Sequence, residues 1–199
     1  VVTENVDLFI DDKAPRIHKQ EPLRGVSNGV FRLMYTEEAS VPHIILYYKG
    51  EAESVYQQDT LLGCPLGRRQ VCTKEINLDP YHGQNVHYYF TVSDLISTTL
   101  GRVQTVAIDT QAPSLELFDP SNLIYTTNFI PFNITLDEKV TLAYSDNGGS
   151  FVNFCRNCHT YQRRKQFSDG AHNLVIKATD QAGNSITTLV GFTIFFVAI

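Results

Sequence analysis

The sequence predicts an all-β fold made of two tandem β-sandwich domains, and three observations support this. Residues 10–22, IDDKAPRIHKQEP, recur at 108–120 as IDTQAPSLELFDP, with Ile, Asp, Ala-Pro and a second Pro at the same spacing. Several segments alternate apolar and polar residues with the period of a half-buried strand. No segment keeps an apolar stripe of helical period. We therefore expect one domain at 11–108 and a homologous one at 109–199.

In the first unit, the segment VHYYFTVSD at 86–94 alternates most clearly, with Val86, Tyr88, Phe90 and Val92 on one face. Alternation in a segment rich in β-branched and aromatic residues is typical of a half-buried strand. The segments NGVFRLMYTEE and HIILYYKG predict earlier strands, and GRVQTVAID predicts the strand that closes the unit.

The second unit repeats this order. NFIPFNITLDE at 128–138 parallels NGVFRLMYTEE, TLAYSDNGG runs into a glycine turn, and HNLVIKATD at 172–180 alternates like VHYYFTVSD. Short strands separated by turns, in units of this size, are typical of an immunoglobulin-like sandwich of two sheets. Proline fixes φ and lacks an N–H, so the Ala-Pro pairs suit stiff junctions between units.

Composition and charge narrow the function class. Charged residues make up 19% of the chain, hydrophobic residues 43%, and the net charge is -5. This is typical of a globular protein and gives no basic footprint for nucleic acid. The apolar stretch at 189–199 is too short and interrupted to form a transmembrane segment. The sequence contains no nucleophile elbow, no Gly-rich phosphate loop and no H-E-x-x-H motif, so we expect no enzyme.

The segment SDGAHNLVIKATDQAGNSITTLVGFTI, at 168–194, resembles the closing strands of bacterial and archaeal Ig-like repeats found in large cell-surface proteins. IDTQAP resembles their inter-domain linker. The first unit matches more loosely, because SDLISTTLGR lacks the Ala-Gly-Asn turn. The resemblance implies an extracellular, structural or adhesive module of an S-layer, adhesin stalk or surface filament. Its partners would be copies of itself or neighbouring repeats, or surface glycans or proteins.

Four cysteines fall two to a unit, Cys64 and Cys72 in the first, Cys155 and Cys158 in the second. Alignment of VHYYFTV with HNLVIKA gives Cys72 and Cys158 the same place, which favours two local structural disulfides in an oxidising compartment. The string Cys155-Arg156-Asn157-Cys158-His159 also has the spacing that attaches c-type haem, which would make the chain an electron-transfer protein. Zinc and a redox pair are further alternatives for these thiols. The chain could also be an accessory binding domain of a secreted enzyme.

Aspartates gather at the expected junctions and turns, and the relatives that the sequence resembles often bind calcium there. The candidate ligands, with Glu37 or Glu38 as further donors, are Asp11, Asp12, Asp94, Asp109 and Asp180. Calcium takes six to eight oxygen ligands, several of them anionic. The alternative is that each Asp caps its own turn. Asn133-Ile134-Thr135 is a glycosylation sequon, although Asn133 falls within a predicted strand.

The two ends of the sequence predict assembly. Residues 5–12, NVDLFIDD, parallel the closing strand RVQTVAID, so we expect residues 1–10 to be either the end of a preceding repeat or a donor strand for a neighbouring subunit. The last strand loses its alternation after Thr193, and a near-continuous apolar run indicates burial on both faces. We therefore expect an inter-unit or inter-subunit contact, unless a loop of the same domain covers these residues. Its expected residues are Val6, Leu8, Ile10, Phe195, Val197 and Ile199.

Overall fold

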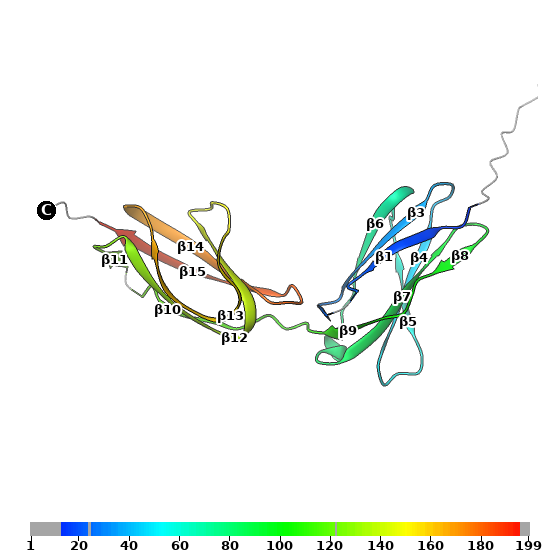
Figure 1. Cartoon of the computed structure of the whole chain (residues 1–199), viewed down its shortest axis with the longest axis horizontal. Coiled ribbons are helices and arrows are strands. Elements are labelled where there is room, and N and C mark those ends of the chain that lie inside the picture. The colour runs from blue at the N-terminus through cyan, green and yellow to red at the C-terminus, as the bar shows by residue number, and fades with distance from the viewer. Residues whose placement is uncertain (1–12, 24, 122, 196–199) are drawn as a thin grey trace, which may run out of the picture. The chain divides into compact units, whose positions relative to one another are not determined.

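The computed structural model describes residues 13–23, 25–121 and 123–195, and divides into two compact units, 1–109 and 110–199 (Figure 1). Almost all regular structure in the described part is β-strand. No helix there has the length and apolarity needed to span a bilayer. The candidate residues Val6, Leu8, Ile10, Asp11, Asp12, Val197 and Ile199 lie outside the described residues.

The first unit is a sandwich of two sheets (Figure 1). One sheet has the order β1-β3-β6, and the other the order β2-β9-β7-β4-β5, with β8 paired to β7. Neighbours are antiparallel except β2 and β9, which are parallel. The strands are β1 (Arg16–Glu21), β2 (Val26–Ser27), β3 (Val30–Glu37), β4 (His43–Gly50), β5 (Gln57–Leu61), β6 (Gly67–Glu75), β7 (Asn85–Ser93), β8 (Thr98–Leu100) and β9 (Gln104–Ile108). A 3₁₀ turn, η1 (Asp79–Tyr81), lies between β6 and β7.

The core of the first unit follows the alternation read from the sequence. Val86, Tyr88, Phe90 and Val92 of β7 are all fully buried, as predicted. They pack with inward residues of the other strands, among them Phe31, whose ring meets Tyr88 edge-on at 4.7 Å. Burying an aliphatic or aromatic side chain contributes about 1.5–3 kcal/mol. Alternate residues of β3, β4 and β7 therefore hold the two sheets together.

The second unit contains the same two layers but joins them differently. Its long strands β12 (Phe129–Asp146) and β13 (Val152–Gln166) each run from one sheet into the other. The first half of β12 pairs with β10 and with the second half of β13, and its second half pairs with β14 and with the first half of β13. The remaining strands are β10 (Leu115–Asp119), β11 (Ile124–Tyr125), β14 (Gly170–Thr179) and β15 (Ser185–Ile194).

The register between β12 and β13 shifts between Thr135 and Val140, which marks the corner where the strands change sheets. The first unit makes the same crossings through loops, at 38–42 and 62–66. The units also agree in detail, because β11 runs parallel to β15 as β2 does to β9. Both peptide bonds before the second repeated proline, Glu21–Pro22 and Asp119–Pro120, are cis. The predicted fold, two tandem immunoglobulin-like sandwiches, is confirmed.

Candidate functional site

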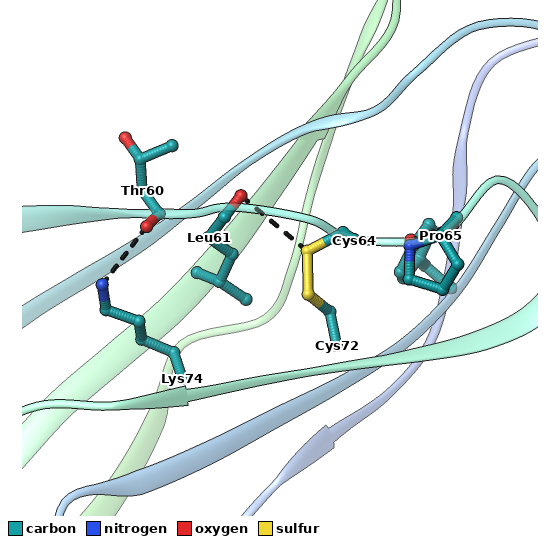
Figure 2. Close-up of a disulfide and its surroundings, with 7 residues drawn as sticks. Thr60, Leu61, Cys64, Pro65, Cys72 and Lys74 are labelled. Carbon is teal, nitrogen blue, oxygen red and sulfur yellow. Dashed lines mark hydrogen bonds between the residues drawn. A yellow bond between two sulfur atoms is a disulfide. The ribbon is translucent and has the colours of Figure 1, made fainter.

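Cys64 and Cys72 form a disulfide in the first unit, as predicted (Figure 2). Cys64 lies in the connection between β5 and β6, and Cys72 lies within β6 opposite Leu33 of β3. Both cysteines are buried. Nearby, Lys74 Nζ donates a hydrogen bond to the Thr60 carbonyl oxygen at 3.3 Å. Because β5 and β6 belong to different sheets, the bridge fixes the point where the chain crosses between them.

Cys155 and Cys158 form the second predicted disulfide, which closes a bulge in β13. Cys155 lies opposite Leu142 and Cys158 opposite Val140, so Arg156 and Asn157 together oppose the single residue Thr141, and β13 carries one extra residue here. Asn157 has a φ of 56°, a left-handed conformation that Asn tolerates better than most residues. Haem attachment would use the two sulfur atoms that are bonded to each other here. His159 is exposed.

The expectation that Cys72 and Cys158 hold equivalent places is wrong. The first half of β12 corresponds to β3 of the first unit. Cys72 lies in β6, which pairs with β3, whereas Cys158 precedes the second half of β13, which pairs with that first half of β12. The connection before β7 spans 76–84, but the connection before β14 spans only 167–169. Counting back from the following strand therefore reaches different structural positions in the two units.

Asp94 and Asp180 each follow the strand that ends at the same turn of their unit. Asp94 Oδ1 accepts hydrogen bonds from the backbone N–H of Ile96 and Ser97 at 2.7 and 2.5 Å. These backbone donors, Ile96 first, lower the pKa of Asp94. Asp180 Oδ1 accepts from the N–H of Gly183 and Asn184 at 2.6 and 2.9 Å. Both aspartates therefore cap their own turns, which is the structural alternative to calcium binding.

Glu138 adds a further carboxylate beside Asp180, and Asp109, Glu37 and Glu38 have polar partners of their own. A carboxylate oxygen of Glu138 and one of Asp180 lie within 4.8 Å of each other in the second unit. In the first unit, Asp109 Oδ1 lies 3.5 Å from His82 Nδ1. Glu37 is buried and accepts from the N–H of Ala39 and Ser40, and Glu38 pairs with Arg68 at 2.8 Å. The partners of Glu37 and Glu38 are therefore other groups than Asp94. Calcium binding stays a prediction.

The other two predicted sites lie on the second unit. Asn133 is partly exposed on β12, opposite Asp119 of β10, and its side-chain oxygen accepts a hydrogen bond from Gln162 at 3.1 Å. Phe195 follows β15 directly, and its side chain is 55% exposed while its N–H donates to the Tyr125 carbonyl. Phe192 and Ile194 point into the core. Alternation therefore continues as far as Phe195, the last residue of this run that the structure describes.

A further group of side chains gathers on the outer face of the second sheet of the first unit. Tyr47 of β4 and Tyr89 of β7 are register partners, and their rings stack with centroids 4.9 Å apart and planes 5° apart. The Tyr56 ring meets Tyr89 at 5.1 Å and 77°, and Lys49 Nζ lies 5.0 Å from the Tyr56 centroid. We call these four residues the tyrosine face.

Two strand sequences carry a signal for the tyrosine face. HIILYYKG and VHYYFTVS each contain two adjacent tyrosines, and adjacent residues of a strand point to opposite faces. With Tyr88 assigned to the core, Tyr89 must face outward. That Tyr47 faces outward beside it depends on the register between β4 and β7, which the sequence does not give.

Comparisons with known proteins give structural likeness only. No family model and no curated protein matches the chain. Among solved structures, the chain is similar to the fibronectin(III)-like modules of Clostridium thermocellum CbhA, at 13% identity and a TM-score of 0.49, covering 92% of this chain and 93% of that one. It is also similar to the FN1–FN3 domains of chicken CNTN1, at 8% identity and a TM-score of 0.49, covering 89% of this chain and 65% of that one.

Proposed function

We propose that the chain is a non-enzymatic, structural or adhesive module of a prokaryotic extracellular surface protein, such as an S-layer, adhesin stalk or filament. The observation that carries this proposal is a pair of sandwich units, each with its own core and its own internal disulfide. Structural disulfides form and persist in oxidising compartments outside the cytoplasm. Small repeated units with separate cores suit a structural module that forms part of a stalk or filament.

The use of the acidic residues agrees with a structural role. The carboxylates of Glu37, Asp94 and Asp180 each accept hydrogen bonds from backbone N–H groups of their own turns. A carboxylate that is committed to its own backbone in this way stabilises a loop. It is less available to act as a general acid or base.

Assembly through the last strand is part of the proposal. Leu189 lies within β15 and is 77% exposed, and Phe195 lies just beyond β15 and is 55% exposed. Both side chains point away from the core on the same face of β15, because side chains alternate along a strand. A neighbouring copy or repeat that contacts β15 would cover them.

Light scattering of the purified chain over a range of concentrations tests this assembly. We expect self-association that is lost in a Phe195→Ser, Leu189→Ser double variant with unchanged circular dichroism. Leu62→Ser is the matched control, because Leu62 is 87% exposed but lies in a loop of the first unit. A monomeric parent chain at all concentrations, or loss of association in the control, contradicts the proposed contact.

A further inference from the structure

The outer face of the second sheet of the first unit has an aromatic centre where a solvated face is usually polar. Ile44 and Leu46 of β4 and Phe90 of β7 point into the core, so Tyr47 and Tyr89 point away from it. One face of an antiparallel sheet is commonly wet, and its residues are then polar. Here, two stacked tyrosine rings remain partly exposed at its centre.

Tyr56 and Lys49 extend this centre toward the hairpin between β4 and β5. The Tyr56 ring packs edge-on against Tyr89, and the Lys49 ammonium lies over Tyr56 and donates to the Glu53 carbonyl at 2.9 Å. Burial, and then the neighbouring phenols of Tyr47 and Tyr56, raise the pKa of Tyr89. The three phenol groups therefore lie close enough to affect one another.

The surroundings of the tyrosine face are neutral hydrogen-bonding groups. His87 and Thr91 of β7 and Thr105 of β9 occupy outward positions, and His87 Nδ1 lies 2.8 Å from Thr105 Oγ1. Gln58 lies opposite Tyr47 on β5. The only acidic residue of β4, β5, β7 and β9, Asp59, lies opposite the buried Leu46 and pairs with Lys74 of the other sheet at 2.6 Å.

The second unit shows that the fold does not need these tyrosines. Alignment of β7 with β14 places Val175 where the first unit has Tyr89. Ser145, the register partner of Val175, takes the place of Tyr47. The same sheet of the same fold therefore forms with a serine and a valine at this position. The aromatic pair is a property of the first unit alone, and its rings contribute little to the buried core.

We propose that the tyrosine face binds a neutral glycan through its pyranose rings. A pyranose ring offers flat C–H surfaces that pack on aromatic rings, and hydroxyl groups that exchange hydrogen bonds with the phenols, Gln58 and His87. The charge of the face agrees, because it lacks outward carboxylates and carries a single ammonium group, Lys49. A nucleic acid would require several cations to neutralise its phosphates. This inference rests on the proposed adhesive role and names the ligand that such a role would use.

Affinity electrophoresis of the full chain tests the proposal, with β-1,4-glucan, β-1,4-linked N-acetylglucosamine polymer and α-mannan each cast separately into native gels. We expect at least one polysaccharide to retard the parent chain. Tyr47→Ser combined with Tyr89→Val should abolish the retardation, since it installs the pair that the second unit already has. Leu100→Ser is the matched control, because Leu100 lies on the same face and is 67% exposed but is not aromatic. It should bind like the parent.

A soluble oligosaccharide of the retarding polymer then provides a second readout. The chain has ten tyrosines and no tryptophan to mask their emission, so a change on titration that the tyrosine double variant lacks reports on this face. Binding should be insensitive to salt and should survive Lys49→Gln. No retardation by any of the three polymers, or equal retardation of the tyrosine double variant, overturns the proposal.

Self-association or capture of a protein partner that is lost in the same double variant, without glycan binding, would also overturn the proposal and assign the face to protein contacts. A chain that assembles through Phe195 but binds no glycan would leave the proposed structural role intact. The two proposals therefore fail separately.

Discussion

His172 Nδ1 lies 2.7 Å from Asp146 Oδ2 in the second unit, and the two side chains join neighbouring strands, β14 and β12. The other ring nitrogen, Nε2, lies 3.0 Å from the Ser168 carbonyl oxygen. The imidazole is buried and stacks on Phe192 at 5.3 Å. A polar ring is thus held inside an aromatic cluster with both nitrogens paired, which satisfies the hydrogen-bonding requirement of a buried group.

Breaking this pair should destabilise the second unit. Asp146→Ala leaves a buried imidazole nitrogen without its partner, which costs about 1–3 kcal/mol. His172→Phe, which keeps an aromatic ring but leaves the Asp146 carboxylate and the Ser168 carbonyl without this partner, should also destabilise the unit. Urea unfolding of the three proteins measures the differences. Glu116→Ala, at an exposed position of β10 in the same unit, is the control and should leave the midpoint within experimental error.

The two disulfides should contribute unequally to stability. Loop-closure entropy predicts about 2.5 kcal/mol for Cys64–Cys72, with a sequence separation of 8, and about 1.6 kcal/mol for Cys155–Cys158, with a separation of 3. Denaturant unfolding of the two double Cys→Ser variants measures each contribution. Peptide mapping of the parent under non-reducing conditions should recover both local bridges. A bridge between units, or a larger loss for the Cys155–Cys158 variant, contradicts this ranking.

Asp94 should support the first unit only above acidic pH. Its folded-state pKa is lowered by the N–H donors of its turn, so its stabilising contribution is complete above the pKa of the unfolded chain. That contribution is lost as the pH falls through the lower pKa of the folded state. Asp94→Ala should therefore be less stable than the parent at neutral pH, and the two should converge at strongly acidic pH. A difference that stays constant with pH would show that the side chain acts without its charge.

Tyr81 should ionise unusually late in an alkaline titration. Burial and the hydrogen bond that its hydroxyl donates to Glu53 at 3.0 Å raise its pKa from 10.0 to about 12. The neutral phenol therefore stabilises the fold below the pKa of the unfolded chain, and this contribution is lost as the pH rises through about 12.

Phenolate absorbance of the parent and Tyr81→Phe should differ by one group that titrates near the pKa of about 12. Glu53→Gln should move that group to lower pH, because the carboxylate favours the protonated phenol. An unchanged titration in the Glu53 variant would mean that burial alone sets the pKa.

Calcium should stabilise the second unit if Glu138 and Asp180 bind it. Glu138 and Asp180 already bring two carboxylate oxygens within 4.8 Å of each other, and calcium prefers several such ligands. Saturation at about a hundred times the dissociation constant would raise the unfolding free energy by about 2.7 kcal/mol. Thermal unfolding with calcium and with chelator measures this. Glu138→Gln should remove the calcium effect, and equal midpoints in both conditions for the parent argue against the site.

How far the sequence predicts the structure can be followed on β7 and β13. The alternation of Val86, Tyr88, Phe90 and Val92 predicted their burial, because a strand has a period of two and this pattern is local. The continuous course of β13 through both sheets left no such signal, since nothing in VNFCRNCHTYQRRKQ marks where it leaves one sheet for the other. The corner depends on its pairing with the two halves of β12.

By itself, the sequence indicated the two units, the alternating strands such as β7 and β14 with their inward faces, and the two local cysteine pairs, because repeats, alternation and short spacings are properties of neighbouring residues. Only the tertiary structure decided which strands lie side by side. That choice depends on register between segments far apart in the chain. It brings Tyr47 against Tyr89 and His172 against Asp146, and it separates Cys72 from the place of Cys158.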